Sequence, residues 1–268
     1  MTNPKALILT GYGINCEEET AFAFNKFGGE SEVVHVNDLI DGSKKMDDYQ
    51  ILAIPGGFSY GDDTGAGKGM ANRVLNNLQE QVLNFVKRDT LTIGICNGFQ
   101  VLTALGLVPA LDEKYGERQA ALMSNTSARY ICRWVRLKNT TDKCVWTKGI
   151  DTLYVPIAHG EGNFHIPEAQ LKELEENNQV AFKYIKEDGS LASREEPFNP
   201  NGSLADITGI CDPSGRIIGL MPHPERAMFL YNRPDFANEK ERMLREGQEL
   251  PSENEGGVMF KNAVEYFG

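Results

Sequence analysis

The chain has 268 residues, of which 41% are hydrophobic and 24% charged, and its formal net charge is −11. This length allows one large domain or two small ones with a sizeable core, and the composition is typical of a soluble globular protein. The acidic excess, with no cluster of Lys or Arg to replace phosphate counterions, argues against a nucleic-acid partner. Because no second fold is indicated, we expect residues 1–268 to form a single domain.

The amino-terminal stretch and the cysteines bear on the compartment. Residues 1–10 hold an apolar run too short for a signal peptide, and no stretch reaches the ~18 apolar residues of a membrane helix. The cysteines are an odd number, widely spread and without a CxxC pair, which indicates neither a disulfide framework nor a zinc site. We therefore expect a cytoplasmic protein with no membrane partner and no metal site.

The first third of the chain predicts alternating strands and helices. Residues 5–9 are typical of a buried strand, and a helix is expected to begin near Asn15 or Cys16 with acidic residues in its first turn. Further strands are expected at residues 31–36 and 49–54. This alternation of strand, helix and strand favours a parallel sheet.

A glycine-rich loop, Pro55-Gly56-Gly57, follows the third predicted strand. In open α/β sheets this edge is where ligands bind, and adjacent glycines allow a backbone N–H to approach a substrate closely. The loop could therefore supply an oxyanion donor, although an ordinary strand-to-helix turn is the alternative. Residues 65–68 are not a P-loop, because GxxxxGK(S/T) requires Gly at 62 and Ser or Thr at 69, where Asp62 and Gly69 stand.

The stretch around Cys96 predicts a nucleophile elbow. An apolar, β-branched run of strand length, residues 91–95, ends at Cys96, and a helical pattern follows at once. A residue in such a strained turn needs small neighbours, which Gly94 and Gly98 are. The helix N-terminus would stabilise a thiolate, and the Asn97 N–H could stabilise an oxyanion. An inert buried cysteine at a strand end is the alternative.

Beyond the elbow the alternating pattern weakens. Strands are expected at residues 129–137, 152–157, 179–185, 205–211 and 216–221, and helices at 70–87, 167–177 and 258–267. A second glycine loop, with His159, Gly160 and Glu161, follows the strand at 152–157. There we expect the backbone of His159, rather than its imidazole, to contact a substrate; His35 and His165 are expected to be structural or solvated. Residues 186–202 predict a polar surface excursion, and residues 232–257 a charged loop or mobile helix.

The segment Met221-Pro222-His223-Pro224-Glu225 closes the last predicted strand. Each proline biases the preceding residue toward an extended conformation, in which residues i and i+2 face the same side. His223 and Glu225 should therefore point together, and a carboxylate beside an imidazole fixes its tautomer and supports its protonated form. A solvated surface turn would explain this segment alone equally well. Combined with the Cys96 elbow, it predicts a Cys-His-Glu triad.

These motifs together resemble the class I (triad) glutamine amidotransferases, and within them the PurQ family of glutaminase subunits of phosphoribosylformylglycinamidine synthase. The matching motifs are residues 56–62 (GGFSYGD), 96–100 (CNGFQ), Asn125, 132–135 (CRWV), 158–162 (AHGEG), 199–203 (NPNGS) and 221–226 (MPHPER). They span nearly the whole chain. The resemblance implies a flavodoxin-like α/β fold with an open mixed, mostly parallel sheet and helices on both faces.

The resemblance also implies an activity, hydrolysis of glutamine to glutamate and ammonia through a thioester on the cysteine. The implied residues are the catalytic Cys96, His223 and Glu225, the oxyanion-hole Gly57 and Asn97, and the substrate-binding Gln100, His159, Gly160 and Glu161. Ammonia would pass to a separate PurL synthetase, which uses ATP and Mg to convert formylglycinamide ribonucleotide in de novo purine synthesis, with PurS as a possible bridge. This chain itself would need no cofactor.

The chain departs from the family in length, and two other classes of protein share part of its pattern. Residues 187–197 and 232–257 exceed the length expected of a compact PurQ member. A cysteine hydrolase of the DJ-1 and PfpI type would share the elbow, but we would expect its histidine where Asn97 stands. A non-catalytic binding module should have lost a triad member, whereas Cys96, His223 and Glu225 are all present.

Overall fold

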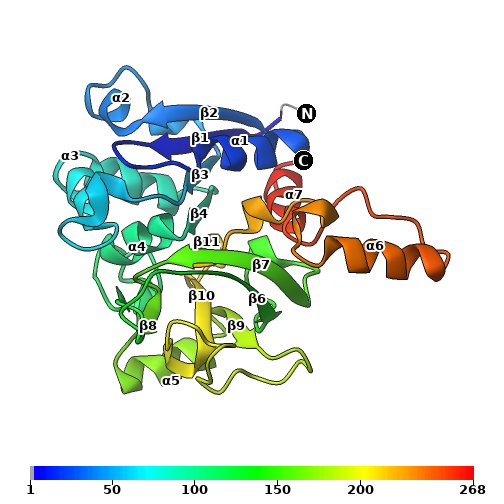
Figure 1. Cartoon of the computed structure of the whole chain (residues 1–268). Helices are drawn as coiled ribbons and strands as arrows, with labels where there is room; N and C mark the ends of the chain where they lie inside the picture. Colours follow the sequence, from blue (N-terminus) through cyan, green and yellow to red (C-terminus); the bar gives the residue numbers. More distant parts are fainter. Residues whose placement is uncertain (1–2) are drawn as a thin grey trace.

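The computed structural model describes residues 3–268, and a nine-stranded sheet with the order β2-β1-β3-β4-β11-β10-β9-β6-β7 runs through it (Figure 1). Its strands are β1 (Lys5–Thr10), β2 (Glu30–His35), β3 (Ile51–Ile54), β4 (Leu91–Ile95), β6 (Ile131–Asn139), β7 (Thr152–His159), β9 (Val180–Ile185), β10 (Ile207–Cys211) and β11 (Ile217–Leu220). The strands β5 (Ala121–Met123) and β8 (Asn163–His165) form a separate pair. The helices are α1 (Glu17–Lys26), α2 (Val36–Ile40), α3 (Lys68–Lys87), α4 (Asn97–Ala104), α5 (Glu168–Glu176), α6 (Phe236–Arg245) and α7 (Gly257–Glu265).

The first five strands in the sheet order form a parallel unit. β1 pairs with β2 and β3, and β4 pairs with β3 and β11, all in parallel. This is the 2-1-3-4-5 order of flavodoxin-like folds, with β11 as the fifth strand. β3 and β4 are buried at every position, which explains why they are apolar throughout rather than alternating.

The remaining strands extend this unit in antiparallel fashion. β11 pairs with β10, β10 with β9, β9 with β6, and β6 with β7, each antiparallel. Only β10 and β6 are therefore reversed, so seven of the nine strands run in one direction. The expected open, mixed and mostly parallel sheet is confirmed. As a consequence, the carboxyl ends of β1, β3, β4, β11 and β7 all lie toward one edge.

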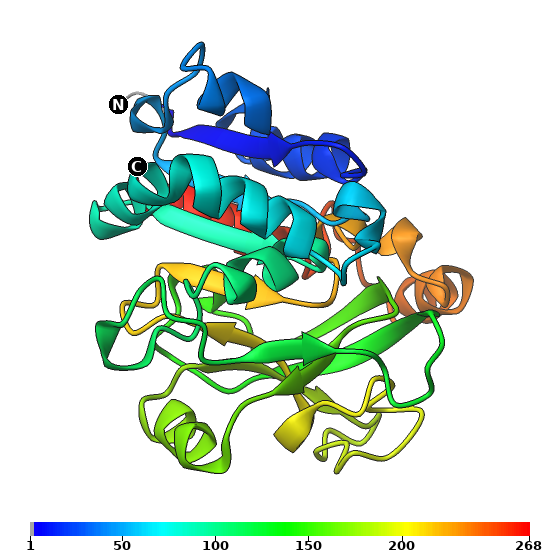
Figure 2. The same cartoon turned by 90° about the vertical axis from the view of Figure 1, so that its left-hand side faces the viewer.

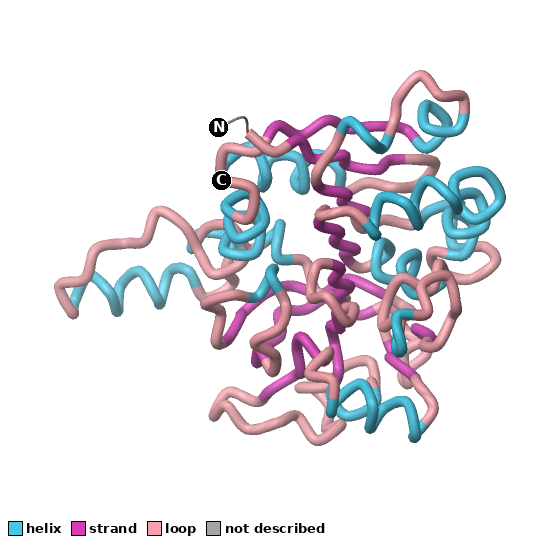
Figure 3. The backbone as a smooth tube through the Cα atoms, turned by 180° about the vertical axis from the view of Figure 1, so that it is seen from behind, coloured by secondary structure: helices cyan, strands magenta, loops and turns pink. Residues whose placement is uncertain are grey.

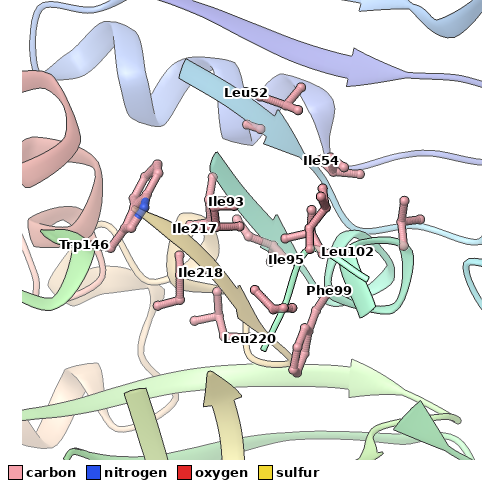
Figure 4. Close-up of a cluster of buried hydrophobic side chains, with 14 of the residues drawn as sticks. Leu52, Ile54, Ile93, Ile95, Phe99, Leu102, Trp146, Ile217, Ile218 and Leu220 are labelled. Atoms are coloured by element: carbon pink, nitrogen blue, oxygen red, sulfur yellow. The ribbon is translucent and has the colours of Figure 1, made fainter. Parts of the chain in front are cut away.

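Helices cover both faces of the parallel unit, as expected. α3 and α4 lie on one face, and α1 and α7 lie on the other (Figures 1 and 2). Figure 4 shows the core between them, in which Phe99 and Leu102 of α4 approach the side chains of β4 and β11. The fit is close: a Cβ added at Gly219 of β11 would lie 2.1 Å from the Phe99 ring. The elbow helix is thus fixed against the strands that carry the site.

The structure corrects the sequence prediction at two short elements. Val36 begins α2, where we expected the strand to continue, because Nδ1 of His35 accepts a hydrogen bond from the Asn37 N–H at 3.1 Å and caps the helix. His35 is therefore structural, as expected. The other correction is the pair of β5 and β8, whose strands of three residues each are too short for periodicity to reveal.

The charged segment after the last strand contains α6, a helix with no buried residue. It projects from the body of the molecule, as Figures 1 and 3 show. Arg242 forms ion pairs with Glu239 and Glu246 along its surface. Within residues 3–268, no helix is both long and apolar enough to cross a membrane.

Candidate active site

Cys96 lies in the strained turn that the sequence predicted between β4 and α4. Its backbone has φ 53° and ψ −105°, a conformation that a residue with a side chain rarely adopts. A Cβ added at Gly98 would lie 1.8 Å from the Ile54 carbonyl oxygen, and one at Gly94 would lie 2.5 Å from the Gly98 carbonyl oxygen. Only glycine fits at either position, so these neighbours allow the strained turn to form.

His223 and Glu225 form a buried pair after β11. Nδ1 of His223 and Oε1 of Glu225 are 2.6 Å apart, which confirms that the two side chains point together. The His223 N–H donates to the Pro156 carbonyl of β7 at 2.8 Å and anchors the segment. Nε2 of His223 is buried and has no hydrogen-bond partner within residues 3–268, so it is the ring nitrogen left for chemistry.

The charges around His223 favour its protonated form. Burial alone would lower the pKa of His223, but the Glu225 carboxylate and the Cys96 and Cys16 thiols outweigh burial and raise this pKa well above 6.5. The imidazole can therefore hold a proton at neutral pH and stabilise a thiolate beside it.

The carboxyl ends of β3, β4 and β7 meet at the His223–Glu225 pair. A Cβ added at Gly56, after β3, would lie 2.7 Å from Cε1 of His223 and 3.5 Å from Cβ of Cys96. From the far end of the sheet, β7 contributes the Ala158 carbonyl, which lies 3.6 Å from Sγ of Cys96. The sheet direction thus brings Cys96, His223 and both glycine loops into one site.

The two expected oxyanion donors have free backbone N–H groups. Gly57 forms a β-bridge with Ile14, but the hydrogen bonds of this bridge are made by the residues on either side of Gly57. Asn97 is the first residue of α4, so no preceding helical carbonyl is available to accept from its N–H. Within residues 3–268, neither N–H donates to a backbone carbonyl. Both groups are therefore available to a ligand.

Hydrogen bonds join the expected substrate-binding residue Gln100, in α4, to Glu161, in the loop after β7. Nδ2 of Asn97 donates to Oε1 of Gln100 at 3.0 Å, and Nε2 of Gln100 donates to the Glu161 carbonyl at 2.6 Å. Oε2 of Glu161 accepts a hydrogen bond from the Ala66 N–H at 3.1 Å. The second glycine loop is thereby joined to the elbow helix.

The imidazole of His159 is buried and holds the second glycine loop in place. Its Nδ1 lies 3.2 Å from Oδ1 of Asn125, and a Cβ added at Gly162 would lie 2.4 Å from its ring. Burial, followed by the charge of His223, lowers the pKa of His159 to about 3, so this ring is neutral. The arrangement agrees with the expectation that backbone groups of this loop, and not the imidazole, face the ligand.

Sequence reasoning missed two residues beside the triad. The first is Cys16, for which we expected no function. Its Sγ, a ring nitrogen of His223 and a carboxylate oxygen of Glu225 all lie within 4.8 Å of one another. Nη2 of Arg226 donates to Sγ of Cys16 at 2.9 Å. Cys16 follows β1, whose carboxyl end shares the edge with β4, and this placement was the only available indication. Burial is the main cause that raises the pKa of the Cys16 thiol.

Known proteins with similar sequences support one family. The profile of the CobB/CobQ-like glutamine amidotransferase domain matches residues 3–267. The chain is 53% identical over 265 residues to the phosphoribosylformylglycinamidine synthase subunit PurQ of Methanococcus maripaludis, covering 98% of this chain and 97% of that protein. It is 42% identical over 267 residues to the PurQ subunit of Dehalococcoides mccartyi, covering 99% and 98%.

Solved structures agree with these sequence matches. A chain in the structure of PurLQS from Thermotoga maritima superposes with a TM-score of 0.72 and 28% identity, covering 99% of this chain and 100% of that chain. A second glutamine amidotransferase from Thermotoga maritima, with 15% identity and a TM-score of 0.52, shares the fold. The chain therefore belongs to the PurQ family of glutamine amidotransferases.

Proposed function

We propose that this chain is the glutaminase subunit of a phosphoribosylformylglycinamidine synthase, which hydrolyses glutamine and supplies the ammonia to a PurL-type synthetase. The observation that carries the proposal is the strained Cys96 beside the buried His223–Glu225 pair, joined at 2.6 Å, in a member of the PurQ family. A thiol, an imidazole and an orienting carboxylate are the parts that acyl transfer requires.

The first half of the reaction makes a thioester. The Cys96 thiolate attacks the side-chain amide carbon of glutamine, and the oxyanion that forms accepts hydrogen bonds from the N–H groups of Gly57 and Asn97. The protonated His223, oriented by Glu225, gives its proton to the leaving nitrogen. The C–N bond breaks, ammonia leaves, and a glutamyl thioester remains on Cys96.

The second half restores the enzyme. His223, now neutral, takes a proton from a water molecule as that water attacks the thioester carbon. The C–S bond breaks, glutamate leaves, and the thiolate of Cys96 and the protonated His223 are restored. The sum is glutamine plus water giving glutamate plus ammonia, with no electron transfer and no step that needs a metal or nucleotide.

The product defines the partner. Hydrolysis alone would waste glutamine, so the ammonia must reach a second active site, and the Thermotoga maritima relative is part of a PurLQS assembly. We infer that this chain acts with a PurL-type synthetase, which uses ATP to convert FGAR to FGAM, and with PurS. We also place it in the cytoplasm, where its five free cysteines would stay reduced.

The test is release of glutamate and ammonia from glutamine, with and without the synthetase, PurS, ATP, Mg and FGAR. Cys96→Ala should lower release at least about 10³-fold. Cys132→Ala, at an exposed cysteine, is the matched control and should behave as the wild type. An arm with a chelator and no nucleotide should retain the Cys96-dependent release. If Cys96→Ala still released ammonia, the mechanism would be wrong. If the chelator abolished the release, the expectation that this chain needs no cofactor would be wrong.

A further inference from the structure

Asn125 is a buried side chain that the proposed mechanism does not use. It lies between β5 and β6, and its amide reaches the second glycine loop after β7. Nδ2 of Asn125 donates to the Arg129 carbonyl and to the His159 carbonyl, each at 2.9 Å. Oδ1 accepts a hydrogen bond from the Gly162 N–H at 3.1 Å. One amide therefore holds the loop at both of its ends.

These hydrogen bonds fix which tautomer His159 adopts. Carbonyl groups can only accept and a backbone N–H can only donate, so the oxygen of Asn125 must be the atom that faces Gly162. The same oxygen lies 3.2 Å from Nδ1 of His159, so Nδ1 must carry the hydrogen. Nε2 of His159 is then a bare acceptor. It is buried and has no hydrogen-bond partner in the part of the chain that the structure describes.

The two buried imidazoles of the site differ in the partner of Nδ1. For His223 this partner is a carboxylate oxygen of Glu225 at 2.6 Å, and for His159 it is an amide oxygen at 3.2 Å. A carboxylate brings the negative charge that stabilises an imidazolium, whereas an amide brings none. Burial accordingly lowers the pKa of His159 to about 3, while the pKa of His223 is raised well above 6.5.

The position of the His159 ring is fixed from a third segment as well. Nδ2 of Asn201 and Oγ of Ser203 both donate to the Gly162 carbonyl, at 2.8 and 3.1 Å. A Cβ added at Gly162 would lie 2.4 Å from Cε1 of His159, so the loop packs directly against the ring. The imidazole and the loop therefore hold each other in place.

The titratable groups near His159 leave this contrast intact. His223, after β11, carries the charge that lowers the pKa of His159 further. Glu161, in the same loop, directs its carboxylate to the Ala66 N–H at 3.1 Å. Tyr130, just before β6, is neutral because burial raises the pKa of its phenol. A proton on His159 would place a second positive charge beside His223.

We propose that Asn125 is a positioning residue that keeps His159 neutral and in one tautomer, so that the proton used in the reaction is held by His223. A carboxylate at position 125 would instead create a second histidine–carboxylate pair beside the first. This inference rests on the proposed function, because it assumes that His223 moves the proton in glutamine hydrolysis.

The first test needs no variant. Nitrogen NMR of the full chain with labelled histidine should show His159 neutral, with its hydrogen on Nδ1, from about pH 5 to about pH 9. A hydrogen on Nε2, or a His159 that gains a proton within this range, would overturn the inference.

The second test exchanges the amide for a carboxylate of nearly the same size. Asn125→Asp should raise the pKa of His159 above about 3, because a negative charge then faces Nδ1. In the complex with the synthetase, kcat for glutamine should fall at least about 10-fold, and its pH profile should gain an ionisation that the wild type lacks. Adding His159→Gln to this variant should remove the extra ionisation.

Asn139→Asp is the matched control. The amide of Asn139 also donates to two carbonyls, those of Thr147 at 3.3 Å and Ile150 at 2.9 Å, but it lies at the opposite end of β6. This variant should keep the wild-type kcat and pH profile.

Three outcomes of the second test would also count against the inference. They are a His159 that stays neutral in Asn125→Asp, a loss of kcat without the extra ionisation, and an equal loss of kcat in Asn139→Asp. The second of these would mean that Asn125 only supports the folded loop. If Asn125→Asp did not fold, the wild-type tautomer would decide. In every case, wild-type hydrolysis that depends on Cys96 would still support the proposed function.

Discussion

At the scale of single residues, the buried His223–Glu225 pair determines the chemistry of the site. A buried imidazole without a carboxylate partner is neutral, as His159 is. Glu225 reverses this outcome for His223 at a distance of 2.6 Å. The two histidines lie in the same site, yet one is a packing group and the other can carry a proton.

Replacing Glu225 by Gln should therefore change both protonation and rate. Without the carboxylate, the pKa of His223 should fall, because Glu225 is the first of the groups that oppose the effect of burial. We expect kcat for glutamine to drop roughly 10²- to 10⁴-fold, since the ring loses its orientation as well as its proton. Proton NMR of the imidazole checks the pKa directly. A Glu225→Gln protein whose His223 titrates as in the wild type would contradict this reading.

The same pair predicts a pH dependence of stability. The pKa of His223 is higher in the folded chain than in the unfolded chain, so the folded state binds its proton more tightly. This stabilisation is complete below the unfolded pKa of about 6.5 and is lost as pH rises through the folded value. The difference in unfolding free energy between wild type and Glu225→Gln should accordingly shrink at alkaline pH.

The sequence was most informative for residues close together in the chain. His223 and Glu225 were found because two prolines set the backbone between them. Cys16 and Arg226 are 210 residues apart, and no local pattern could show that they touch. Asp62 was noted because it excluded a P-loop and ended a family motif, but its contact with Asn97 depends on how the loop after β3 folds over α4.

At the scale of elements, the junction of β4 and α4 is the most constrained part of the fold. Gly98→Ala would place a Cβ 1.8 Å from the Ile54 carbonyl oxygen, so α4 would have to move away from β3. We expect a loss of more than about 3 kcal/mol in the free energy of unfolding by urea. The control is Gly149→Ala, where φ is also positive but no atom lies within 4 Å, and about 1–2 kcal/mol is expected. Equal losses for the two variants would contradict the close contact of α4 with β3.

The projecting helix α6 should contribute little to stability. Leu244 is 52% exposed, whereas Leu102 of α4 is fully buried. Leu244→Ala should change the free energy of unfolding by less than about 0.5 kcal/mol. Leu102→Ala should cost about 2–5 kcal/mol, because it removes buried apolar surface and leaves a cavity. Comparable losses, measured by denaturant unfolding, would show that α6 packs more tightly than its exposure indicates.

Long or fully buried helices and strands could be predicted from the sequence, whereas short elements could not. The buried strands β1, β3 and β4 and the long helix α3 were expected within a few residues of their observed bounds. The short α2 was missed because its cap is a histidine side chain, which composition does not reveal. The position of β7 at the far end of the sheet could not be derived either, because strand order depends on long-range pairing.

At the scale of the whole molecule, the common direction of seven strands is what assembles the site. It places the ends of β1, β3, β4, β11 and β7 at one edge, where Cys96, His223 and both glycine loops meet. The added length noted in the sequence is compatible with the family, since the match covers 97% of the Methanococcus maripaludis relative.

FGAM formation by the reconstituted complex, with either glutamine or ammonium chloride as nitrogen source, shows whether Cys96 is the nucleophile that releases ammonia. The wild-type chain should support both reactions. Cys96→Ala should abolish the glutamine-dependent reaction and leave the ammonium-dependent reaction unchanged, because only ammonia production needs the thiol. If the complex with Cys96→Ala still used glutamine, Cys96 would not be the nucleophile.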